Sequence, residues 1–141
     1  MRILIVEDDM SSQLLLRKLL ESYGACDVAI NGKEAVEACR RARAEGDPFV
    51  LVCLDIMMPE MDGHAALKVI RTDEEAQGLL PSQCAKIVMT TALRELEAVA
   101  NAYRELCDAY LVKPIQRDKL VAVLKDLKLL SFSKEQLTPL H

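Results

Sequence analysis

Five polar side chains stand where apolar runs of the sequence end: Glu7, Asp8, Asp55, Thr91 and Lys113. An apolar run that stops at a carboxylate and a turn is typical of a buried strand that delivers a charge to the rim of a sheet. Because the carboxyl ends of parallel strands meet at one edge, we expect the five side chains to lie together. Three carboxylates there repel one another unless a cation binds, and Mg²⁺ prefers such oxygen ligands. We therefore expect a Mg²⁺ site with Asp8 and Asp55 as direct ligands and Glu7 acting through water.

The same side chains predict transfer of a phosphoryl group to Asp55. A carboxylate with an ordinary pKa of about 4 is ionised at neutral pH and can attack phosphorus. Phosphoryl transfer depends on positioning and charge neutralisation, which Mg²⁺ and the Lys113 ammonium would provide. Thr91 would donate a hydrogen bond to a phosphoryl oxygen.

The elements that must position these residues alternate between strand and helix. Short apolar runs predict five strands, over residues 3–6, 26–30, 49–54, 86–90 and 109–112. A helical pattern follows each one, so we expect an α/β fold, a doubly wound five-stranded parallel sheet with five helices. Residues 1–130 form the predicted domain, and residues 131–141 a C-terminal tail or the start of a linker.

Capping residues predict where three of the helices begin. Ser11 or Ser12 is the expected N-cap of the first helix, which we expect to stop at Gly24. Asn31, with a glutamate three residues later, has the form of a capping box for the second. Asp62 is the expected cap of a third helix over residues 64–72, and a polar loop is expected over residues 73–84.

Composition narrows the range of partners and surroundings. The 18 basic and 22 acidic residues are evenly mixed and give a net charge of -4, so nucleic acid and anionic membranes are not expected as partners. The five cysteines are far apart and form no C-x-x-C pair, which argues against disulfides and a zinc site. No signal segment or 18-residue apolar run is present, and we expect a cytoplasmic location.

Four stretches together resemble the receiver domain of two-component response regulators. They are Glu7-Asp8, LDIMMPEMDG over residues 54–63, Thr91-Ala92, and YLVKP over residues 110–114. The resemblance extends over nearly the whole chain and implies the flavodoxin-like sheet order 2-1-3-4-5. It also implies phosphorylation of Asp55 by a sensor histidine kinase or a phosphotransfer protein.

Roles follow from the resemblance position by position. Mg²⁺ would be bound by the acidic residues and by the backbone carbonyl of Met57, and the phosphoryl group by Thr91 and Lys113. Tyr110 would be the aromatic switch that alters the surface around the fourth helix, fifth strand and fifth helix. The implied chemistry is limited to phosphorylation and dephosphorylation of Asp55, so the chain is not expected to act as an enzyme on other molecules.

The resemblance also implies partners. A downstream effector protein or a fused output domain would receive the signal, and a homodimer that forms on phosphorylation is allowed. The only histidines, His64 and His141, are expected at the surface and outside helix interiors, so the phosphate donor is expected to be another molecule.

Two apolar side chains predict a long-lived phosphoryl group. Met57 lies two residues after the acceptor and Leu93 two residues after Thr91, and neither can orient a hydrolytic water by hydrogen bonding.

Three other classes of protein fit the sequence less well. A haloacid-dehalogenase-like phosphatase would have a second aspartate at position 57, and a flavin carrier a hydroxyl-rich loop after the first strand. A receiver-like interaction module that takes no phosphate would lack some of the acceptor and binding residues, all of which are present.

Overall fold

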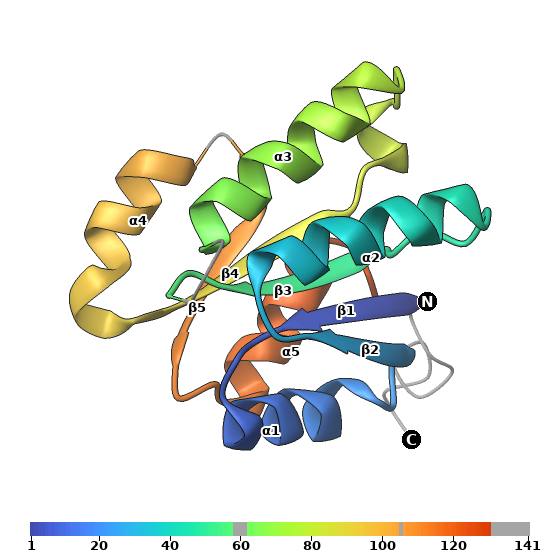
Figure 1. Ribbon diagram of the computed structural model, residues 1–141. Coiled ribbons are helices and arrows are strands. Elements are labelled where there is room, and N and C mark those ends of the chain that lie inside the picture. Colours follow the sequence, from blue (N-terminus) through green and yellow to red (C-terminus); the bar gives the residue numbers. More distant parts are fainter. Residues whose placement is uncertain (58–61, 105, 131–141) are drawn as a thin grey trace.

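The computed structural model describes residues 1–57, 62–104 and 106–130. Within them strands and helices alternate as the sequence predicts (Figure 1). The strands are β1 (Arg2–Val6), β2 (Ala25–Ala29), β3 (Leu51–Asp55), β4 (Lys86–Ala92) and β5 (Ala109–Lys113). The helices are α1 (Met10–Leu20), α2 (Gly32–Ala44), α3 (Gly63–Ala76), α4 (Leu96–Tyr103) and α5 (Arg117–Asp126), with 3-10 helices η1 (Pro81–Gln83) and η2 (Leu93–Glu95).

The described strands form one parallel sheet in the order β2-β1-β3-β4-β5. This confirms the predicted fold class and strand order. The register pairs Val6 with Leu54, Asp55 with Thr90, and Ala92 with Lys113. The carboxyl ends of four strands therefore meet at one edge, and the residues that follow them share that edge.

Helices cover both faces of the sheet and form two apolar layers (Figure 1). Leu4 and Val52 face α2, α3 and α4, whereas Ile5 and Cys53 face α1 and α5, and all four are buried. Successive residues of a strand point to opposite faces, so a strand covered on both sides must be apolar throughout. The polar residues at the strand ends are exceptions to this apolar pattern.

The first helix differs from its prediction at both ends. Its N-cap is Asp9 and neither Ser11 nor Ser12, because the Asp9 carboxylate accepts hydrogen bonds from the backbone N–H and the hydroxyl of Ser12, both at 2.9 Å. The helix ends at Leu20, before Gly24. Gly24 instead allows close approach of the chain start, since a Cβ there would collide with the backbone oxygen of the first residue.

The other two predicted caps are confirmed. The Asn31 side chain accepts a hydrogen bond from the N–H of Glu34 at 2.8 Å, and the Glu34 carboxylate accepts one from the N–H of Ile30 at 3.0 Å. Asp62 accepts a hydrogen bond from the N–H of Ala65 at 3.0 Å. These caps satisfy backbone donors that the first turn of a helix leaves without partners.

Helix α3 continues past the predicted end at Thr72, and η1 lies within the stretch predicted as loop. The charged residues that suggested a loop are used in ion pairs. Asp73 lies 2.6 Å from Arg40 of α2, and Glu74 lies 2.7 Å from Arg71 one turn earlier. Strand β4 is also longer than predicted and runs to Ala92.

Arg71 joins α3 to the starts of β4 and β5, at the sheet edge opposite Asp55. Its guanidinium donates hydrogen bonds to the backbone oxygens of Leu106 at 2.7 Å and Ala85 at 2.9 Å. It also binds the carboxylates of Glu74 and Asp108, at 2.7 and 2.9 Å. The Arg71 guanidinium thus holds the segments that precede β4 and β5 against α3.

No helix in residues 1–57, 62–104 and 106–130 combines the length and apolar character needed to cross a membrane. The predicted tail, residues 131–141, lies outside the described residues. The domain boundary at residue 130 therefore stays a prediction.

Candidate functional site

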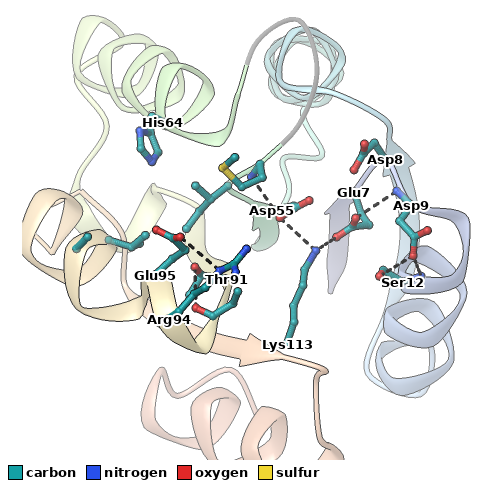
Figure 2. Close-up of a pocket in the computed structure, with 15 residues that line it drawn as sticks. Glu7, Asp8, Asp9, Ser12, Asp55, His64, Thr91, Arg94, Glu95 and Lys113 are labelled. Atoms are coloured by element: carbon teal, nitrogen blue, oxygen red, sulfur yellow. Dashed lines mark hydrogen bonds and ion pairs between the residues drawn. The ribbon is translucent and has the colours of Figure 1, made fainter.

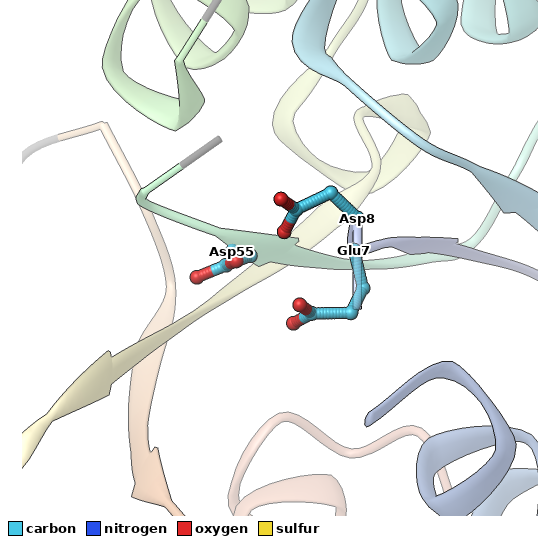
Figure 3. Close-up of side chains that lie close together, drawn as sticks. All are labelled: Glu7, Asp8 and Asp55. Carbon is cyan, nitrogen blue, oxygen red and sulfur yellow. The ribbon is translucent and has the colours of Figure 1, made fainter. Parts of the chain in front are cut away.

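Three carboxylates gather at the carboxyl edge of the sheet (Figure 3). Glu7 and Asp8 follow β1, and Asp55 is the last residue of β3. One oxygen from each lies within 4.8 Å of the others. Glu7 and Asp55 are buried and Asp8 is exposed, so the group has one face open to solvent. The structure therefore brings together the three acidic residues that the sequence predicted.

Lys113, at the end of β5, lies between two of these carboxylates (Figure 2). Its Nζ is 2.7 Å from an oxygen of Glu7 and 3.2 Å from an oxygen of Asp55. Burial raises the pKa of Glu7, although the hydrogen bond from Lys113 opposes that shift. Burial would lower the pKa of Lys113, but the hydrogen bond to Glu7 and the attraction of Asp55 outweigh it and raise that pKa. The lysine is therefore held as a cation beside the predicted phosphate acceptor.

The two adjacent threonines of β4 occupy different environments. Thr91 lines the cavity beside Asp55, and its hydroxyl donates a hydrogen bond of 3.4 Å to the backbone oxygen of Ala92. Thr90 is 1% exposed, and its hydroxyl finds no hydrogen-bond partner within the described part of the chain. The structure thus places Thr91, the predicted phosphate-binding residue, in the lining of the cavity, whereas Thr90 is buried and is not among the lining residues.

Tyr110 is half-buried on the face of the sheet that α4 covers. Its hydroxyl donates a hydrogen bond of 3.3 Å to the backbone oxygen of Ala100 in α4. Burial raises the pKa of this phenol. The predicted switch residue therefore connects β5 to α4.

The turn after Asp55 is built from backbone contacts. The N–H of Met57 donates to a carboxylate oxygen of Asp55 at 3.4 Å, and the N–H of Gly63 donates to the backbone oxygen of Ile56 at 3.0 Å. The Met57 side chain is 75% exposed. Its backbone carbonyl, the predicted fourth Mg²⁺ ligand, stays a prediction.

A cavity of about 690 Å³ opens over the acidic group and extends toward α4 (Figure 2). It contains residues that the sequence did not single out for this site: Asp9, Ser12, Ile56, His64, Arg94, Glu95, Ala98 and Val99. His64, predicted as a surface residue, is half-buried and lines this cavity. The sequence could have indicated that His64 lies near Asp55, because His64 is one residue after the start of α3 and that helix begins beside Asp55. His141 lies outside the described residues.

The chain matches a known protein family over most of its length. A family model for the response regulator receiver domain matches residues 3–125. The chain is 33% identical over 123 residues to the chemotaxis protein CheY of Treponema pallidum, covering 85% of this chain and 77% of that protein. Several other curated relatives are far longer. The chain spans only 10% to 26% of relatives that include an osmosensing histidine kinase and a DNA-binding transcriptional regulator.

Solved structures share the fold. The co-crystal structure of the Saccharomyces cerevisiae histidine phosphotransfer protein Ypd1 with the receiver domain of Ssk1 contains a chain that matches with a TM-score of 0.75 and 28% identity, covering 92% of each chain. The receiver domain of a Pseudomonas aeruginosa sensor histidine kinase matches with a TM-score of 0.71 and 25% identity, covering 89% of this chain and 95% of that one. That structure has a magnesium ion coordinated in its active site cleft.

Proposed function

This chain belongs to the response regulator receiver family of two-component signalling, and on that premise we propose that Asp55 is its phosphate acceptor. One observation carries the proposal. The ammonium of Lys113 lies 3.2 Å from the Asp55 carboxylate, in a cavity that Thr91 also lines. The site thus combines a nucleophile, a cation and a hydroxyl donor, which are the groups that phosphoryl transfer needs.

The proposed step is attack of an Asp55 oxygen on phosphorus. Lys113 neutralises charge on the phosphoryl oxygens, since its raised pKa keeps it protonated at neutral pH. The Thr91 hydroxyl is held by only a long hydrogen bond of 3.4 Å, so it can turn to donate to a phosphoryl oxygen. The product is an acyl phosphate on Asp55.

The donor set suits a magnesium ion. The three carboxylates offer only oxygen, and one ammonium cannot neutralise all three, since Lys113 pairs with Glu7 and Asp55 but not with Asp8. Asp8 and Asp55 would bind the ion directly, Glu7 through water, and Met57 through its backbone carbonyl. When bound, Mg²⁺ supplies positive charge to the phosphoryl oxygens.

The signal would leave the site through α4 and β5. As Thr91 moves toward the phosphoryl group, it vacates space on the side of the sheet where Tyr110 lies. Turning inward would cost Tyr110 its hydrogen bond to Ala100 and would change the surface formed by α4, β5 and α5. Phosphorylation would shift an existing equilibrium between the two arrangements.

We place this domain, residues 1–130, between a phosphate donor and an effector. The donor would be a sensor histidine kinase or a phosphotransfer protein, as the pairing of Ssk1 with Ypd1 suggests. The effector would be a separate protein or a fused output domain, since longer relatives contain further sequence. A cytoplasmic location suits such partners.

Intact mass tests the central proposal. The protein is incubated with acetyl phosphate and Mg²⁺, with and without a chelator, beside an Asp55→Asn variant. We expect one added phosphoryl group that requires both Mg²⁺ and Asp55. No added mass in a folded sample would instead favour a receiver-like module that binds partners without phosphate.

A further inference from the structure

The turn between β1 and α1 is held by the side chain of Gln13, the fourth residue of α1. The Gln13 amide nitrogen donates a hydrogen bond of 2.7 Å to the backbone oxygen of Glu7. Side chains of a helix point back toward its N-terminus, so a residue near the helix start can reach the chain that leads into it. The half-buried Gln13 therefore ties α1 to the residue that directly follows β1.

The oxygen that Gln13 binds belongs to the peptide unit that joins Glu7 to Asp8. A peptide unit is planar, so a hydrogen bond to its oxygen restrains backbone rotation on both sides of it. Glu7 and Asp8 supply two of the three carboxylates of the acidic group, whose oxygens lie within 4.8 Å of one another (Figure 3). One amide contact thus bears on the directions of two carboxylates.

Asp8 depends on this contact more than its neighbours do. The Glu7 carboxylate accepts hydrogen bonds from the backbone N–H of Asp9 at 3.2 Å and from Lys113 at 2.7 Å (Figure 2). The Asp9 carboxylate is held by its two hydrogen bonds from Ser12. Within the described part of the chain, the exposed Asp8 carboxylate has no hydrogen bond or ion pair. Its direction is therefore set by the backbone that carries it.

We propose that Gln13 is a positioning residue for the magnesium site and acts through the peptide unit between Glu7 and Asp8. The inference rests on the proposed function, in which Asp8 and Asp55 bind the ion directly. Loss of the amide donor frees the peptide unit to rotate and spreads the directions of the Asp8 carboxylate. Mg²⁺ demands a near-octahedral set of oxygen ligands, so a less ordered ligand holds it less tightly.

Gln13→Met is the variant that tests this role. Methionine has the same unbranched length and a similar helix propensity but carries no N–H donor. Gln116→Met is the matched control, since it makes the same substitution at an exposed position. Gln116 makes no side-chain capping bond to α5 and is not among the residues that line the cavity.

The experiment is an NMR titration of the unphosphorylated, isotope-labelled protein with MgCl₂, which measures Mg²⁺ affinity without a phosphate donor. We expect the dissociation constant for Mg²⁺ to rise about tenfold in Gln13→Met and to stay unchanged in Gln116→Met. Before Mg²⁺ is added, the amide signal of Asp8 should move in Gln13→Met alone, because that N–H belongs to the restrained peptide unit. The same spectra show whether each variant is folded.

An unchanged Mg²⁺ affinity in Gln13→Met would overturn the positioning role, and so would an equal loss in Gln116→Met. If Gln13→Met does not fold, Gln13→Ala removes the same donor with the strongest helix former and decides by the same criterion. Wild-type protein that binds Mg²⁺ but takes no phosphate from acetyl phosphate would overturn Asp55 as acceptor, while the Mg²⁺ affinities would still decide the role of Gln13. Wild-type protein that binds no Mg²⁺ would overturn the metal site and the positioning role together.

Discussion

A methyl group at Gly63 would overlap the backbone oxygen of Asp55 and would lie 2.9 Å from Cα of Ile56. Glycine is therefore required where α3 begins, because the helix starts directly against the end of β3. We predict that Gly63→Ala displaces the Asp55 backbone, lowers the free energy of unfolding by about 2 kcal/mol, and slows phosphorylation by acetyl phosphate. Urea unfolding and intact mass measure the two effects.

Gly46→Ala is the control for backbone strain alone. Gly46 has a φ of +76° and no atom near an added Cβ, so alanine there is strained without touching the site. It should lower stability by about 1 kcal/mol and leave the phosphorylation rate unchanged. If both glycine variants slowed phosphorylation equally, Gly63 would have no special role in positioning Asp55.

Met57 offers a test of phosphoryl lifetime. Its side chain lines the cavity and is 75% exposed, whereas Leu93, at 72% exposed, is not among the residues lining it. We predict that Met57→Asn shortens the lifetime of phosphorylated Asp55, because an amide can hold the attacking water by a hydrogen bond. Loss of mass with time measures the rate. Leu93→Asn should have a smaller effect, and an unchanged rate in Met57→Asn would contradict the hypothesis.

Thr90 and Thr91 should respond differently to loss of the hydroxyl. Burying a hydroxyl without a partner costs free energy, so Thr90→Val should raise the free energy of unfolding by about 1 kcal/mol. Phosphorylation of that variant should be retained. Thr91→Val should leave stability nearly unchanged and impair phosphorylation or its transmission to α4. A loss of stability in Thr90→Val would show that its hydroxyl has a partner.

Asp73 should give the stability a defined dependence on pH. Its hydrogen bond with Arg40 lowers the pKa of Asp73, so the carboxylate stabilises the fold above its ordinary pKa and less as pH falls through the folded value. Asp73→Asn should cost about 1 kcal/mol at pH 7. The difference from wild type should narrow below about pH 4 in urea unfolding. Asp126→Asn, at the exposed end of α5, is the control variant. A gap that stayed constant from about pH 5 down to about pH 2 would exclude this cause.

Much of the site was predictable because strand ends of a parallel sheet share an edge. Asp55 and Lys113 are 58 positions apart in sequence, yet each ends a short apolar run, and that pattern alone brought them together. The distinction between Thr90 and Thr91 was also available, since alternate residues of a strand face opposite sides. The structure brings these side chains to one edge, and their roles stay predictions.

The rest depended on contacts that local pattern does not encode. Asp73 and Glu74 suggested a loop after α3, but distant arginines pair with them and the helix continues. The cap of α1 shifted to Asp9 because two donors of Ser12 point at one carboxylate. His64 and Ala98 line one cavity only because α4 lies beside the start of α3, which no periodicity reports.

The hydrogen bonds that Arg71 makes with the segments before β4 and β5 have an evolutionary consequence. Polar contacts with Leu106 and Asp108 hold the start of β5 from the side of α3, so the start of that strand has support besides its contacts with α4. The outer side chains of α4 can then drift to suit new targets while the sheet keeps its geometry. We therefore expect substitutions to accumulate faster on the exposed face of that helix than at Arg71, so that the output surface can diverge while the sheet keeps its geometry.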